Sequence, residues 1–209
     1  MISRPVKVRK IPPRIDPDQL EADLKDFAGR AREEGAGEIA IIGSAEVIFS
    51  PETLSRVEAD SGYRSFHWPL KHPRDSFAEA VQAYRRGLFF TLPGAAEMPD
   101  YRGGPISNPA HREAYRRIYR IVGKIEAAAF YLGYHLALGL ASGNCRAVFC
   151  ENERLCAALV KPENCRYPLK SRASLEAMGI DAGAMAGNLG WKLPADRATG
   201  FPVGLVMVA

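Results

Sequence analysis

Hydrophobic positions in the first third of the chain recur with the period of a helix before giving way to short apolar runs. From residue 16 to residue 34 one face is apolar, formed by Leu20, Leu24, Phe27, Ala28 and Ala31. This spacing is typical of an amphipathic helix. Asp16 is suited to cap it, Pro17 suits its first turn, and Gln19 would complete a box-like cap. We predict that this helix ends near Gly35 and Gly37.

Short apolar runs follow and predict the strands of a sheet. Residues 38–42 and 88–92 are continuous apolar segments of strand length, and residues 47–49 are a third candidate. Between them we predict one helix starting at residues 50–51 and another over residues 75–86. A helix followed by a glycine and an apolar strand is typical of a layered α/β fold.

The second of these helices has a clear apolar face and a clear end. Phe77, Val81 and Tyr84 share one side of it, and Gly87 stops it just before the strand at 88–92.

The longest element is predicted over residues 108–140, with Asn108 and Pro109 at its start. Its inner face is formed by Ile118, Ile121, Val122, Ile125, Ala129, Leu132 and Leu136. Residues 127–142 carry no formal charge, which predicts burial on every side, but the segment is too short to span a bilayer. We expect this helix to be the rigid arm that positions Cys145.

The C-terminal part is predicted to hold two short helices and a last strand. One helix covers residues 174–178 and ends at Gly179, and Asp181 caps the next, which runs to about residue 187. Residues 203–208 are an apolar run that we expect to insert into the sheet. The whole predicts a single-domain α/β protein, residues 15–209, with a central mixed sheet flanked by helices and a C-terminal cysteine-rich metal-binding loop at 143–172.

Composition is compatible with one domain and excludes several functions. The chain has 209 residues, 47% of them hydrophobic, and a formal net charge of +4. That charge is too small to indicate a nucleic-acid or membrane surface. Residues 1–14 form a basic, proline-bearing arm without the apolar core of a secretory signal, so we expect a cytoplasmic protein. No glycine-rich phosphate loop or hydrolase elbow occurs.

All four cysteines lie in one short window, at Cys145, Cys150, Cys156 and Cys165. Clustered thiols indicate a shared metal centre, and disulfides would need an oxidising compartment. Four-cysteine zinc sites usually use two tight pairs, which the C-x4-C-x5-C-x8-C spacing lacks. A [4Fe–4S] cluster is wider and accepts ligands from a wrapping loop. The spacing therefore favours iron–sulfur and leaves zinc as the alternative.

Basic residues outnumber acidic ones around these cysteines. Residues 145–172 contain six cations and three carboxylates. Because four thiolates around zinc or an oxidised four-iron cube sum to about minus two, nearby cations would stabilise either centre. We take Arg146, Arg166 and Arg172 as the candidate cofactor-binding cations. The alternative is that they are solvated loop charges.

Two histidines in the loop at residues 60–73 are further candidates. His67 and His72 could be ligands or acid–base groups, although beside aromatic residues and prolines they are more often ordinary loop residues.

The C-terminal third resembles a family of predicted metal-binding proteins, domain of unknown function 2284. The resemblance rests on the cysteine spacing and on a block that matches at Cys165, Arg166, Pro168, Arg172, Ser174, Glu176, Ala177, Gly179, Ile180 and Asp181. Ala173 stands where the family usually has proline. The likeness extends over about residues 31–209 and implies a cysteine-bound metal, iron–sulfur in type, with no established reaction. Residues 55–73 lack the cysteine found there in many members, which argues against a second, N-terminal site.

These observations predict a protein that binds an iron–sulfur cluster and works in electron transfer or as an accessory subunit of a redox system. A structural metal module within a larger complex, or a cluster-dependent enzyme using a histidine such as His67, are the alternatives. The expected partner is a redox protein or a larger complex, with self-association left open.

Overall fold

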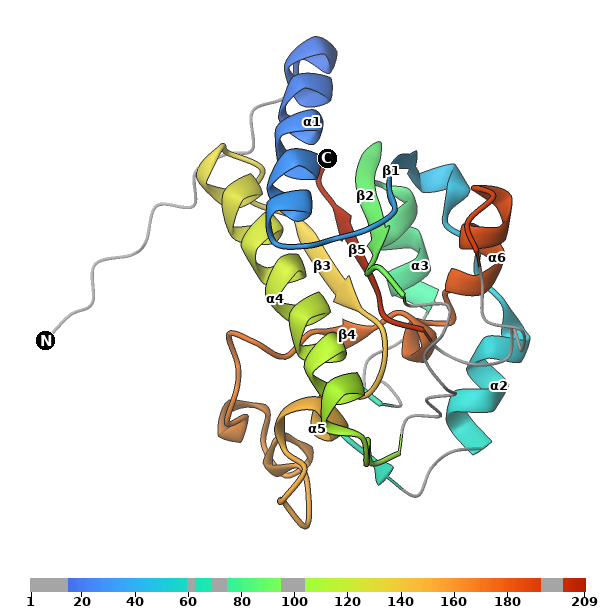
Figure 1. The fold of residues 1–209 in the computed structure, drawn as a ribbon, viewed down its shortest axis with the longest axis vertical. Coiled ribbons are helices and arrows are strands. Elements are labelled where there is room, and N and C mark those ends of the chain that lie inside the picture. Colours follow the sequence, from blue (N-terminus) through green and yellow to red (C-terminus); the bar gives the residue numbers. More distant parts are fainter. Residues whose placement is uncertain (1–14, 60–62, 69–74, 95–103, 193–200) are drawn as a thin grey trace, which may run out of the picture.

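The computed structural model describes residues 15–59, 63–68, 75–94, 104–192 and 201–209, with only the backbone for residues 75–77 (Figure 1). The basic arm at residues 1–14 and His72 lie outside these ranges. A five-stranded sheet is at the centre, in the order β1-β2-β5-β3-β4. The strands are β1 (Ile39–Gly43), β2 (Arg86–Thr91), β3 (Leu138–Ala141), β4 (Ala173–Ser174) and β5 (Val203–Met207).

The sheet is mixed, as predicted. β5 pairs antiparallel with β2 on one side and β3 on the other, β1 pairs antiparallel with β2, and β4 runs parallel to β3. Every residue of β5 is buried, which agrees with its continuous apolar sequence. The last strand of the chain is therefore the middle strand of the sheet.

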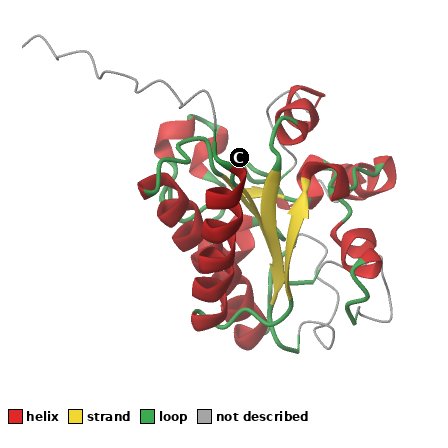
Figure 2. Ribbon diagram, turned by 90° about the horizontal axis from the view of Figure 1, so that it is seen from above, coloured by secondary structure: helices red, strands yellow, loops and turns green. Residues whose placement is uncertain are grey.

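Helices cover both faces of the sheet, so the fold is an α/β domain with three layers (Figure 2). α1 (Pro17–Glu33) and α4 (Pro109–Tyr131) pack on one face, against Leu88, Phe90 and Val206. α3 (Asp75–Gln82) and α6 (Ala182–Asn188) lie on the other, against Phe89 and Leu205. The alternation of β2 side chains between the two cores follows from the period of two in a strand.

The remaining elements are short. They are α2 (Pro51–Ala59), α5 (Cys145–Phe149) and the 3-10 turns η1 (Ser44–Glu46), η4 (Ala157–Leu159), η5 (Pro162–Asn164) and η6 (Glu176–Met178). The cap predicted at Asp16 forms, since its carboxylate accepts from the Asp18 amide at 3.0 Å. Gln19 does not complete the box, because its side chain donates to Asp23 instead.

Two glycines let α4 pack close to the sheet. A Cβ built on Gly139 would lie 2.6 Å from the Val122 side chain, and one on Gly204 would lie 2.7 Å from the same side chain. Larger residues there would push α4 outward. The close contact fixes the height of α4 above β3 and β5.

The prediction of one helix over residues 108–140 is wrong at its C-terminal end. α4 ends at Tyr131, where Gly133 adopts φ +100°, and the chain then forms β3. Complete burial of this uncharged stretch is also wrong, because Tyr131 is 85% exposed and Leu136 is 61% exposed. Residues 127–142 contain the end of a helix, a turn and a strand, and their uniform lack of charge gave no sign of these boundaries.

Three smaller differences concern element ends. Residues 47–49 do not form a strand of the sheet, and Phe49 makes only an isolated bridge to Ile180. α3 ends at Gln82 rather than at residue 86, because Arg86 already belongs to β2. The short helix predicted over residues 174–178 is wrong at its start, because Ser174 belongs to β4 and only the 3-10 turn η6 follows. Its end at Gly179 (φ +79°), the cap at Asp181 and the strand at residues 203–208 are confirmed. No helix within the described parts of the chain is long and apolar enough to cross a membrane.

Candidate metal centre

Cys145 is placed by the turn from β3 into α5, not by the end of α4. Asn144 caps α5, because its side-chain oxygen accepts from the Arg146 amide at 3.0 Å while its side-chain nitrogen donates to Tyr63 O at 2.7 Å. Cys145 is the first residue of α5 and is buried. Its thiol lies 3.8 Å from Ser65 Oγ. The first candidate ligand is thus fixed between the sheet and the segment around residue 64.

The turn itself is anchored by Glu176. One carboxylate oxygen of Glu176 accepts from the Gly143 amide at 3.1 Å and from Ser174 Oγ at 2.6 Å. On the other side Tyr119 donates its hydroxyl to Gly143 O at 3.0 Å. Burial raises the pKa of the Glu176 carboxyl, and the bonds from Ser174 and Gly143 oppose that rise.

The other three cysteines follow along one irregular segment. Cys150 directly follows α5, Cys156 directly precedes η4, and Cys165 directly follows η5. The Cys165 thiol lies 3.5 Å from Ser171 Oγ. None of the four is in a disulfide.

All four cysteines line one pocket. It encloses about 370 Å³ free of protein atoms, part of it open to solvent, and Phe149, Tyr167 and Arg146 complete the wall with their neighbours. Only about 20 Å³ of that space has room for the centre of a water molecule, so the pocket is narrow. The structure therefore brings the predicted ligand residues to a common pocket, although 19 residues lie between the first cysteine and the last.

The thiols are not arranged around a single ion. Among the described residues no group of three or more histidine, cysteine, aspartate or glutamate side chains is positioned to hold a metal ion. Tetrahedral zinc, with bonds of about 2.3 Å, requires sulfurs about 3.8 Å apart. Four free thiols around one pocket are a donor set that suits a thiophilic metal centre.

Two of the thiols, Cys145 and Cys150, hold their protons more tightly than a free cysteine does. Burial raises the pKa of Cys145 to about 12, and the other three cysteines add to the rise. Burial also raises the pKa of Cys150, followed by the effects of Cys156 and Cys165. Since metals bind the thiolate, loading this site must release protons and must weaken as the pH falls.

Arg146 is buried beside the pocket and holds its walls together. Its guanidinium donates to the carbonyls of Glu153 at 3.0 Å and Arg154 at 2.7 Å, and it stacks on the Tyr63 ring at 3.8 Å. The Nε of Arg146 is buried without a hydrogen-bond partner. The guanidinium forms no ion pair with a carboxylate of the described residues. A buried cation of this kind favours an anionic neighbour.

The other predicted cations differ in their position. Arg166 lines the pocket and pairs with Glu153. Arg172 is not among the lining residues, and its guanidinium pairs with Glu126 at 2.7 Å. Their role as cofactor-binding cations stays a prediction, which the geometry favours for Arg166 more than for Arg172. His67 is described but does not line the pocket, and its ring packs edge-on against Phe66.

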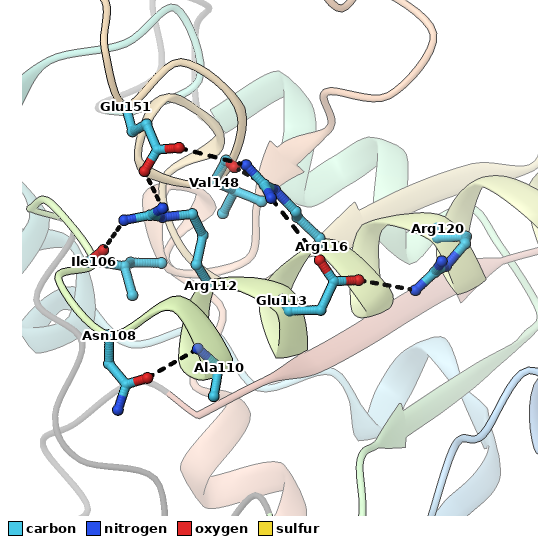
Figure 3. Close-up of polar contacts among 9 residues, drawn as sticks. All are labelled: Ile106, Asn108, Ala110, Arg112, Glu113, Arg116, Arg120, Val148 and Glu151. Atoms are coloured by element: carbon cyan, nitrogen blue, oxygen red, sulfur yellow. Dashed lines mark hydrogen bonds and ion pairs between the residues drawn. The ribbon is translucent and has the colours of Figure 1, made fainter.

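Sequence analysis missed the arginines of α4 that hold the far end of α5 (Figure 3). Arg116 Nε donates to Val148 O at 3.0 Å, and both Arg112 and Arg116 pair with Glu151, the residue after Cys150. Their spacing of four residues, which puts them on one helix face, was the available signal.

The fold and the pocket together define an α/β domain with a thiol-lined candidate metal site. The chain belongs to the family described as predicted metal-binding proteins, DUF2284, whose characteristic sequence matches residues 60–208. That range includes all four cysteines and four of the five strands. No curated protein and no solved structure matches the chain.

Proposed function

We propose that this protein holds a [4Fe–4S] cluster on Cys145, Cys150, Cys156 and Cys165 and passes single electrons to or from a redox partner. The observation that carries the proposal is the common pocket lined by four free thiols from four different points of the chain. A family described as metal-binding agrees with it.

A cluster suits the site better than a zinc ion does. The four thiols come from separate points of the segment and line one common pocket. The spacing C-x4-C-x5-C-x8-C also lacks two tight pairs. A cube offers four irons to four separated sulfurs, so each cysteine needs to reach only its own corner.

The protein would bind the cluster, shield it from solvent and balance its negative charge. A bound cluster supplies a centre that accepts and releases one electron. Cys145 would bind from the buried side of the pocket, and the segment from Cys150 to Cys165 would cover the solvent side. Arg146 would offset the negative charge of the thiolates from within the wall, where water screens it least.

The test is anaerobic purification followed by iron, sulfide and zinc analysis, visible absorption and electron paramagnetic resonance. We expect about four irons and four sulfides per chain, a brown colour that bleaches reversibly, and loss of cluster in each single Cys→Ser variant. A colourless protein with one zinc per chain would refute the proposal. A variant that keeps full iron and sulfide would remove that cysteine from the site.

A structural metal is the second candidate, and one observation favours it. Within residues 150–172 only Ala158 and Ser171 are buried. A segment with so little core needs another source of order, which a metal would supply. If the metal is structural only, the loaded protein will bind it tightly but will show no reversible one-electron reduction.

A further inference from the structure

A second hollow lies beside the thiol pocket and is lined by α4, by Phe149 of α5 and by residues 167–170. Its volume is about 610 Å³, within the range of small-molecule sites. Phe149 and Tyr167 line both this groove and the thiol pocket. One layer of aromatic side chains therefore separates the two.

The groove is strongly cationic. Arg116, Arg120, Lys124 and Lys170 line it, against a single lining carboxylate, Glu113. Glu113 lies 3.4 Å from the Arg120 guanidinium and 3.9 Å from that of Arg116, so one carboxylate serves two arginines. Lys170 forms no ion pair with the described residues, and its ammonium lies 5.9 Å from the Tyr167 ring centre. Arg116 also pairs with Glu151, which it shares with Arg112, and Lys124 pairs with Glu34. With Arg112 included, five cations face three carboxylates, so two positive charges remain for an anion from solution.

Aromatic rings and small side chains shape the groove. Phe149 and Tyr167 have ring centres 5.6 Å apart and an interplanar angle of 32°. The floor is formed by Gly123 and Ala127, one turn apart on α4. A Cβ on Gly123 would meet only Arg172, at an ordinary 3.5 Å, so packing does not require a glycine that weakens the helix. The glycine keeps the groove open.

We propose that this groove binds a phosphorylated aromatic molecule of the nucleotide class, with its phosphate among Arg116, Arg120 and Lys170 and its ring against Phe149 and Tyr167. Cations alone would suit any anion, and rings alone would suit any planar molecule. Both kinds of group line one hollow of this volume, which selects a ligand that carries a phosphate and an aromatic ring. Binding does not depend on the proposed metal, although a ligand there would lie beside it.

The test is calorimetric titration with adenosine 5′-monophosphate, compared with adenosine and with inorganic phosphate. We expect saturable binding of the nucleotide, at least tenfold tighter than either fragment and weakened by salt. The variant Arg120→Glu/Lys170→Glu should bind at least tenfold more weakly. Lys25→Glu/Arg30→Glu is the matched control, because Arg30, like Arg120, is exposed and pairs with a carboxylate of its own helix. It should bind as the natural protein does.

A second variant tests the shape of the groove without changing its charge. Ala127 is exposed, so Ala127→Phe should fold normally and fill the groove, again with at least a tenfold loss. Absence of saturable binding up to 10 mM nucleotide, equal losses in the groove and control variants, or phosphate binding as tight as the nucleotide would each overturn the proposal. So would tight binding of a poly-glutamate peptide without nucleotide binding, which would assign the groove to an acidic protein segment. Iron and sulfide are measured on every sample, so a failure here is distinguishable from a failure of the metal proposal.

Discussion

At the scale of single residues, the candidate centre depends on what surrounds each thiol. Cys145 is enclosed by the core, whereas Cys150, Cys156 and Cys165 are partly open to solvent. Burial raises the pKa of Cys145 to about 12 and also raises the pKa of Cys150. A metal that binds these two thiols must therefore displace firmly held protons.

The raised pKa of Cys145 predicts that the metal-free, reduced protein loses stability in alkali. Well below pH 9 the thiol is neutral in both the folded and the unfolded protein, so its burial contributes its full stabilisation to the unfolding free energy. As the pH rises from 9.0 toward the folded pKa of about 12, only the unfolded thiol ionises, and the unfolding free energy falls by up to about 1.4 kcal/mol per pH unit. Urea denaturation between pH 8 and pH 10 measures this. Cys145→Ala should show a shallower fall, and parallel curves would contradict the argument.

For the proposed cluster, the position of Arg166 predicts an effect on the reduction potential. Arg166 lines the pocket and is 57% exposed, so water screens its charge. A unit charge at roughly 10 Å in such a medium shifts a one-electron potential by on the order of 20 mV. Because a cation favours the reduced, more negative cluster, Arg166→Gln should lower the potential by about that amount in a redox titration. Lys161→Gln, an exposed cation of the same segment outside the pocket wall, should change it less. An equal or upward shift would exclude a direct electrostatic role.

Residue types alone were enough to find the four cysteines and the cations around them. They were not enough to separate Arg146, which is buried in the pocket wall, from Arg172, which Glu126 neutralises. Asn144 and Glu176 were missed as supports of Cys145 for the same reason. Each acts through a partner more than 30 residues away in the sequence or through a local cap, and spacing gives no sign of such partners.

At the scale of elements, the junction of β3 and α5 is the part that the candidate site depends on most. Glu176 of η6 accepts from the Gly143 amide, and Arg116 of α4 donates to the carbonyl of Val148 near the end of α5. The short helix carrying Cys145 is therefore held at both ends by elements of the core. Five residues could not form a stable helix without these contacts.

Glu176 offers a test of this support. Glu176→Ala leaves the Gly143 amide and the Ser174 hydroxyl without their acceptor, which should cost about 1–3 kcal/mol in the unfolding free energy. Iron and sulfide content should fall as well, because the turn that presents Cys145 loosens. Glu176→Gln keeps an acceptor oxygen and should recover most of both. Glu163→Ala, at an exposed site, is the control. Loss of stability with full cluster content would show that Glu176 supports the fold alone.

Element boundaries were harder to predict than the elements themselves. α1, α2, α6 and β5 follow from caps, glycines and apolar period. The uncharged residues 127–142 carry apolar side chains that suit a buried helix and a buried strand equally well. Only the left-handed Gly133, and the pairing of β3 with β5, decide the division.

At the scale of the whole molecule, the sheet joins distant parts of the chain around the candidate site. β5, from the last residues, lies between β2 and β3, and no local pattern could predict that order. The side of the sheet formed by β3 and β4 supports the thiol pocket, because the segment with Cys150, Cys156 and Cys165 connects α5 to β4. Three of the four cysteines thus lie in a connecting segment that contributes no strand to the sheet.

This arrangement predicts that removing the metal opens one segment and leaves the rest folded. Residues 150–172 add only two buried side chains to the molecule, so a bound cluster would supply most of their order. We expect trypsin to cut after Arg154, Arg166 and Lys170 at least tenfold faster in the chelator-treated protein, as followed by mass spectrometry. Cleavage after Lys25 and Arg30 of α1 should not change, and circular dichroism should retain the helical signal. Equal cleavage of the segment with and without the cluster would mean that Arg146 and its carbonyl contacts already fix it.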